Sequence, residues 1–220
     1  MRKTTDEEPG YQDKYPSFEA CVRFHGHTCP GLATGYRMAT TAMRTLGVKR
    51  PYDEELVCIA ETDACGVDAI QMVTGCTAGK GNLAIRDYGK HAFTFISRDS
   101  GRGIRILVRR ADSPDRAAMM DNLRKRVFSG KATAGEPAEY RSLMEGAAAR
   151  ILAAPEKDIL DIREVRLETP KMASIFTTIT CASCGEPVAD ARTSMVDGLR
   201  VCIPCSEMLS GKGGRPGHEH

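Results

Sequence analysis

Apolar residues recur at helical spacing in the N-terminal part of the chain. Positions three or four apart, followed by Gly47, predict a helix that ends at this glycine. A shorter helix over 17–23 is expected before it, with Ser17 as its N-cap. The longer helix has its apolar positions at Leu32, Tyr36, Ala39, Met43 and Leu46. It also carries small residues that allow another element to approach closely, at Gly31, Gly35, Ala39 and Ala42.

Continuous apolar runs replace this pattern in the middle of the chain and predict strands. The run 56–60 is expected to be a buried strand, and a helix capped by Asp63 should follow it to about Val73. Three more runs are separated by turn signals, and such short turns favour antiparallel pairing. They cover 83–85, 92–96 and 104–108.

Two helical patterns and an alternating segment complete the predicted core. The helices cover 113–128 and 136–153, and 162–167 alternates as an edge strand does. The predicted fold is α+β, with a mainly antiparallel sheet packed with helices and a small C-terminal zinc finger. The predicted order is a disordered lead-in (1–16), the core domain (17–167), a linker (168–178), the zinc-finger module (179–210) and a mobile tail (211–220).

Composition narrows the classes of function. The net charge is +2, aromatic residues make up 5% of the chain and Trp is absent, which argues against a nucleic-acid partner. No apolar run has the length of a membrane span, and the N-terminus lacks the apolar region of a secretory signal. We therefore expect a cytoplasmic protein with no membrane partner.

Two Cys-x-x-Cys pairs near the C-terminus predict a structural zinc site. The pairs lie 17 residues apart, and in an intracellular chain thiols at this spacing are metal ligands rather than disulfides. Asp197-Gly198 between them indicates a hairpin, and a short helix should follow the second pair. Knuckle, hairpin, knuckle and helix is the order of a treble-clef finger. The four ligands are Cys181, Cys184, Cys202 and Cys205.

A second group of chemically active side chains lies in the core domain. They come from three glycine-bearing segments next to the predicted strands, where binding and catalytic residues concentrate. Each of them alone also fits a structural role, but polar loops are a poor place for inert thiols. The candidates are His25, His27, Cys29, Cys65, Asp68, Cys76 and Lys80.

Two chemistries fit this group. In the first, a second transition metal is bound with one position open, by ligands from His27, Cys29, Cys65 and Cys76. In the second, Cys65 or Cys29 is a nucleophile, and His25 or His27 is its base. The sequence leaves both open.

The chain contains four motifs next to these candidates: residues 24–37, which contain the first His/Cys segment, and residues 61–71, 75–77 and 79–82. Together they resemble the FmdE family, which takes its name from formylmethanofuran dehydrogenase. The resemblance implies an α+β core with an auxiliary treble-clef zinc finger, usually in a homodimer. It also implies an active site on the His/Cys loop and the 65–76 segment.

The same resemblance gives one of two functional hypotheses. It implies association with a molybdenum- or tungsten-dependent formylmethanofuran dehydrogenase, which reduces carbon dioxide to the formyl level, or with another oxidoreductase. The chain would then be a metal-binding accessory protein of that enzyme. The alternative is a stand-alone enzyme that uses a Cys/His pair on a small carbonyl or thiol substrate.

Overall fold

The computed structural model describes residues 15–109, 114–170, 172 and 176–211. The chain divides into two compact units, Met1–Met172 and Ala173–His220, and each is described by itself. Nearly all of the predicted lead-in and tail lies outside the described residues, as does part of the predicted linker.

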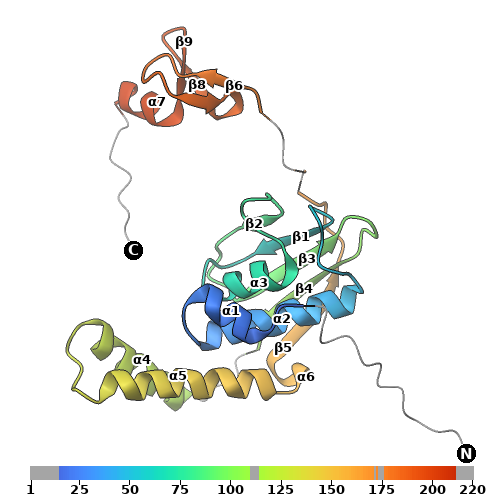
Figure 1. The fold of residues 1–220 in the computed structure, drawn as a ribbon, viewed down its shortest axis with the longest axis vertical. Helices are drawn as coiled ribbons and strands as arrows, with labels where there is room; N and C mark the ends of the chain where they lie inside the picture. The colour runs from blue at the N-terminus through green and yellow to red at the C-terminus, as the bar shows by residue number, and fades with distance from the viewer. Residues whose placement is uncertain (1–14, 110–113, 171, 173–175, 212–220) are drawn as a thin grey trace, which may run out of the picture. The chain divides into compact units, whose positions relative to one another are not determined.

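The first unit is built on a five-stranded mixed sheet with the order β2-β1-β3-β4-β5 (Figure 1). Three of its four strand pairs are antiparallel and one is parallel, so the predicted α+β class with a mainly antiparallel sheet is confirmed. The strands are β1 (Leu56–Ala60), β2 (Leu83–Ile85), β3 (Ala92–Ser97), β4 (Gly103–Val108) and β5 (Leu160–Val165).

The pairing of β2 differs from the prediction. The short turns predict antiparallel neighbours from 83 onwards, but β2 pairs parallel with β1, with Cys58 opposite Leu83. Strand β3 pairs antiparallel with β1 on its other side, with Cys58 opposite Phe95. The reason is the helix α3 (Gly66–Thr74), which connects β1 to β2. It brings the chain back to the end of the sheet where β1 began, so that β2 runs in the same direction as β1.

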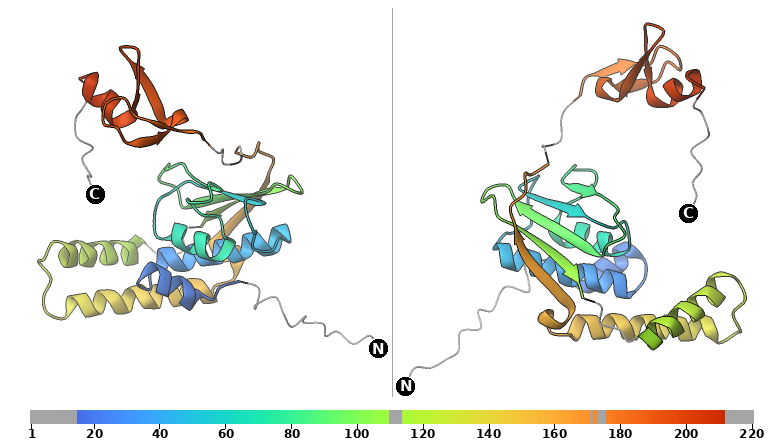
Figure 2. Two further views of the ribbon diagram at one scale, coloured as in Figure 1. Left: turned by 45° about the horizontal axis from the view of Figure 1, so that its top comes forward. Right: turned by 180° about the vertical axis from the view of Figure 1, so that it is seen from behind.

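Helices cover one face of this sheet (Figures 1 and 2). Helices α1 (Phe18–His25), α2 (Pro30–Leu46) and α3 lie on that face, and α5 (Glu136–Ala153) packs against α2. Helix α4 (Pro114–Phe128) forms a hairpin with α5, and the short α6 (Glu156–Ile159) leads into β5. No helix in the described part of the chain is long and apolar enough to cross a membrane.

The ends of the first two helices follow from their capping residues. The hydroxyl of Ser17 accepts the N–H of Ala20 at the start of α1, and Gly26 ends this helix with a left-handed φ of 97°. Helix α1 therefore runs to His25, two residues further than predicted. Only the short segment 26–29 separates it from α2, so the predicted His/Cys loop is mostly a junction between two helices.

The second unit consists of two hairpins and a helix. The strands are β6 (Thr178–Thr180), β7 (Pro187–Ala189), β8 (Thr193–Val196) and β9 (Leu199–Cys202); the short 3₁₀ helix η2 (Asp190–Arg192) precedes β8, and α7 (Ile203–Leu209) follows β9. Asp197 and Gly198 both have positive φ, 49° and 78°, as the predicted two-residue hairpin turn requires. The elements follow the predicted order of knuckle, hairpin, knuckle and helix.

Candidate functional site

The four cysteines of the second unit converge on one point. Their sulfur atoms all lie within 4.8 Å of one another, and the Sγ atoms of Cys184 and Cys202 are 3.9 Å apart. Four thiolates around a zinc ion, with Zn–S bonds of about 2.3 Å, have sulfurs about 3.8 Å apart. The donor set and its spacing therefore fit a tetrahedral zinc ion, with no ligand position left open.

Backbone groups favour the thiolate form of Cys181. The N–H of Cys202 donates to Sγ of Cys181 over 3.2 Å. Backbone N–H groups of Cys184 and Cys202 lower the pKa of Cys181 to about 6. The buried cluster of this unit is small and includes three of the ligands themselves, so a bound metal replaces the core that a module of this size lacks.

In the first unit, one chain segment brings together three of the predicted side chains. Ligand atoms of His25, His27 and Cys29 lie within 4.8 Å of one another. His25 is the last residue of α1 and Cys29 is the N-cap of α2, and the turn at Gly26 folds the segment so that the two imidazole rings lie 4.5 Å apart. His27 is exposed and Cys29 is buried, so the group extends from the surface into the core.

A carboxylate from another element orients His25. The Nδ1 atom of His25 lies 2.7 Å from Oδ2 of Asp68, on the first turn of α3. The other ring nitrogen, Nε2, faces Sγ of Cys29 at 3.9 Å. This is the arrangement of a metal-binding histidine, whose second nitrogen donates to a carboxylate. It is also the order of a nucleophile, a base and an orienting acid.

The thiol of Cys29 lies at the beginning of α2 and near a second thiol. Its sulfur accepts the N–H of Leu32 over 3.3 Å, and its exposed fraction is 2%. Burial raises the pKa of Cys29 to about 11, against the lowering effect of the Leu32 N–H and with a contribution from Cys65. A Cβ built on Gly31 would lie 3.9 Å from Sγ of Cys29 and 4.0 Å from Sγ of Cys65. The two thiols therefore border the same small space.

Cys76 and Lys80 lie elsewhere. Cys65 directly precedes the first residue of α3 and Cys76 follows its end, so the nine-residue helix separates them by roughly 14 Å. Cys76 is fully buried and its thiol donates to the carbonyl of Leu56, while Lys80 donates to the carbonyl of Asp53. Both side chains fasten the segments near the start of β1, whereas Cys65 and Asp68 follow its end. Cys76, one of the predicted metal ligands, and Lys80, another of the seven candidates, thus lie apart from the other five, with α3 between them.

The sequence gives no signal that Glu61, the first residue of the 61–71 motif, pairs with Arg105 to support this site. Glu61, directly after β1, is almost buried and forms a bidentate pair with Arg105 of β4. The guanidinium of Arg105 lowers the pKa of Glu61. The pair anchors the segment that leads to Cys65, but its partners are 44 positions apart, and nothing local marks the pairing.

Fold and site together define an α+β protein that carries a His/His/Cys group in its core and a four-cysteine zinc-finger module at its C-terminus. The family described as "FmdE, Molybdenum formylmethanofuran dehydrogenase operon" matches residues 24–161. The chain belongs to this family. The "Prokaryotic dksA/traR C4-type zinc finger" matches residues 175–207, which contain all four clustered cysteines.

Two relatives extend the comparison. The chain is 31% identical over 192 residues to a "Probable S-adenosyl-L-methionine-binding protein" of Archaeoglobus fulgidus, with 83% of this chain covered. It spans about half, 50%, of that relative's length. The crystal structure of a tungsten formylmethanofuran dehydrogenase FmdE-like protein from Syntrophus aciditrophicus shares the fold, with a TM-score of 0.53 at 22% identity. The match covers 94% of this chain and 97% of that one.

Proposed function

We propose that the first unit binds a transition metal ion through His25, His27 and Cys29, and that the protein is a metal-binding accessory to an oxidoreductase. The observation that carries this is the three-ligand group with Asp68 on the second nitrogen of His25. A tetrahedral ion with imidazole and thiolate ligands needs N–S separations of about 3.6 Å. The 3.9 Å between His25 and Cys29 is close to this value.

Within this site each residue has a separate task. His25 presents Nε2 to the ion, because Asp68 occupies Nδ1. Cys29 supplies a thiolate and His27 an exposed imidazole, which leaves at least one coordination position for Cys65 or an external ligand. The ion would supply Lewis-acid or redox chemistry at that position.

Metal analysis of the purified full chain tests this. We expect about two metal equivalents per chain, one in the finger and one in the core. Cys29→Ala should remove only the second, whereas Cys76→Ala, which deletes an equally buried thiol outside the group, should retain both. A single equivalent in the wild-type protein, or equal losses in both variants, would exclude the core metal.

The geometry also supports a second function, a thiol enzyme. Sγ of Cys29 lies 3.9 Å from Nε2 of His25, and Nδ1 of His25 lies 2.7 Å from Oδ2 of Asp68. A nucleophile, its base and an orienting carboxylate follow one another in the same order. The low exposure of Cys29 weighs against it, because a substrate would have to displace its neighbours. Alkylation of the core thiols by iodoacetamide without release of metal would favour the thiol enzyme. Protection of the thiols by bound metal would favour the metal site.

The names of the relatives support an oxidoreductase partner. The family description and the solved relative both refer to formylmethanofuran dehydrogenase, a molybdenum or tungsten enzyme by those names. We therefore propose that a homodimer of this chain works beside such an enzyme or another oxidoreductase. Affinity purification of the tagged chain from its own cells should retain molybdenum or tungsten in the eluate. The wild-type mass in solution should be twice that of one chain.

The name of the Archaeoglobus relative gives a further ligand to test on the core site. Its name refers to S-adenosyl-L-methionine, and this chain matches about half of it. Titration of the metal-loaded chain with S-adenosyl-L-methionine, followed by the absorption of cobalt in the core site, tests whether the shared half binds this ligand. A saturable spectral change that Cys29→Ala abolishes would support binding at this site, and an unchanged spectrum would exclude it.

A further inference from the structure

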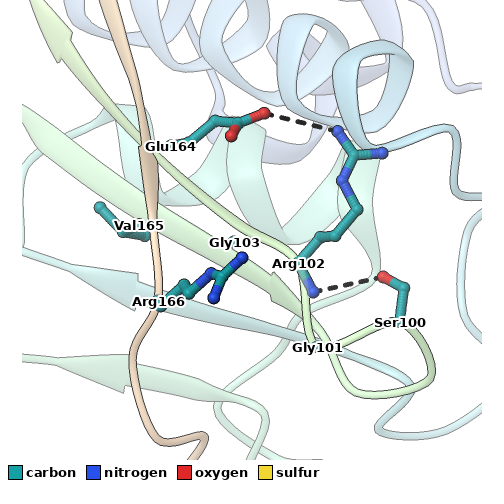
Figure 3. Close-up of a pocket in the computed structure, with 7 residues that line it drawn as sticks. All are labelled: Ser100, Gly101, Arg102, Gly103, Glu164, Val165 and Arg166. Carbon is teal, nitrogen blue, oxygen red and sulfur yellow. Dashed lines mark hydrogen bonds and ion pairs between the residues drawn. The ribbon is translucent and has the colours of Figure 1, made fainter.

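The first unit has a concave site at the other end of the sheet from the His/His/Cys group. A cavity of about 660 Å³ is lined by residues 100–103, which form the β3–β4 turn and the start of β4, and by 164–166 at the end of β5 (Figure 3). Gly103 pairs with Ile96 of β3, and the next residue, Ser97, lies opposite Leu56 at the start of β1. Cys65 and Asp68 follow the other end of β1.

Two arginines border this cavity. The β4–β5 ladder ends with Gly103 opposite Val165, and Arg102 and Arg166 are the next residues of the two segments beyond this last pair. Two positive charges at one cavity repel each other. An anion between the two guanidinium groups would remove this repulsion.

Both guanidinium groups are available to such an anion. Arg102 lies 3.8 Å from Glu164, and these side chains are 54% and 84% exposed, so the pair is loose and solvated. Among the described residues, no carboxylate or carbonyl pairs with Arg166. Figure 3 shows both arginines and Glu164 at the wall of the cavity. Two arginines and one glutamate leave a net charge of one positive unit there.

We propose that this cavity binds a small organic carboxylate, held between the guanidinium groups of Arg102 and Arg166. A planar guanidinium matches a carboxylate through two parallel N–H···O bonds. The net charge of one positive unit suits a singly charged carboxylate better than a phosphate dianion. Val165 provides an apolar contact for the rest of the ligand, and the volume lies within the range of small-molecule sites.

A nuclear magnetic resonance titration of the full chain, read from its backbone amide signals, tests this proposal. Titration with isovalerate should shift the N–H signals of Gly101 and Gly103 to saturation. The neutral isovaleramide should not shift them, and inorganic phosphate should bind more weakly than isovalerate. No saturable shift with isovalerate, or tighter binding of phosphate, would overturn the proposal.

Variants identify the residues. Arg102→Gln and Arg166→Gln should each weaken isovalerate binding about tenfold or more. Arg163→Gln is the matched control, because Arg163 is an exposed arginine on β5 that pairs with Asp161 and does not line the cavity. Its affinity should stay within about twofold of wild type. An equal loss in the control would indicate diffuse attraction by the basic surface and would also overturn the proposal. All three side chains are largely exposed, so thermal midpoints should not change.

Discussion

The backbones of α2 and α3 touch at Gly35 and Gly66. A Cβ built on Gly35 would overlap the carbonyl oxygen of Gly66, and one built on Gly66 would lie 3.5 Å from the Cα of Gly35. This close approach holds the start of α3, with Cys65 and Asp68, against the segment of His25 and Cys29. The small-residue stripe of α2 therefore determines the geometry of the candidate site.

Gly35→Ala should destabilise the first unit by about 2 kcal/mol, because the added methyl meets backbone that cannot rotate away. It should also lower the metal content of the core while the finger retains its zinc. Gly146→Ala is the control: its Cβ would meet only Arg150, at an ordinary 3.6 Å, so this substitution within α5 should stabilise by up to about 1 kcal/mol. Urea unfolding and metal analysis measure both effects, and a neutral Gly35→Ala would show that the helices can separate freely.

Asp68→Asn should reduce the affinity of the core metal about 10- to 100-fold. The carboxylate fixes the tautomer of His25 and raises the basicity of its Nε2, and an amide does this poorly. Competition with a chromophoric chelator measures the affinity. Asp121→Asn removes the same charge from α4, where Asp121 pairs with Lys125, and should leave the affinity unchanged. Equal affinities for wild type and Asp68→Asn would remove Asp68 from the site.

Glu61 should make the stability of the first unit depend on pH below about 5. Arg105 lowers the pKa of Glu61 in the folded state relative to the unfolded chain. The contribution of Glu61 to the free energy of unfolding is therefore fully present above its pKa in the unfolded chain. It is lost as the pH falls through its pKa in the folded protein. Glu61→Gln should cost about 2 kcal/mol at pH 7 and progressively less on acidification.

Urea unfolding between pH 7 and pH 3, followed by circular dichroism, measures this difference. The curves for wild type and Glu61→Gln should converge at low pH. Glu139→Gln, at an exposed position of α5, should follow the wild-type curve throughout. A constant offset between wild type and Glu61→Gln at every pH would mean that packing, and not the charge of Glu61, accounts for its contribution.

Cys205→Ser should abolish zinc binding and unfold the second unit. Cys205 is 3% exposed, and its buried cluster contains, among the described residues of this unit, only Val201 and two other ligands besides it. Amide signals of β8, β9 and α7 should collapse to unfolded positions, and a strong chelator should do the same to wild type. Phe93 and Phe95 belong to a separate buried cluster, so their signals should remain at folded positions. A finger that stays folded without zinc would contradict this.

Local patterns determined much of the fold. Helix caps such as Ser17, the turn at Asp197-Gly198 and the apolar run 56–60 each encode an element within a few residues, and the structure contains all three. The four zinc-finger cysteines are equally predictable, because two short pairs around a hairpin bring their sulfurs together without help from the rest of the chain.

The tertiary structure decided which distant residues meet. The sequence marks Asp68, Cys76 and Lys80 alike, yet only Asp68 lies on the first turn of α3, within reach of His25. The parallel pairing of β2 with β1 and the cavity that Arg102 and Arg166 share likewise depend on how the strands pack and pair. Local propensity fixes backbone conformation over a few residues. Contacts between distant segments follow from burial and close packing of the whole core, which no local pattern records.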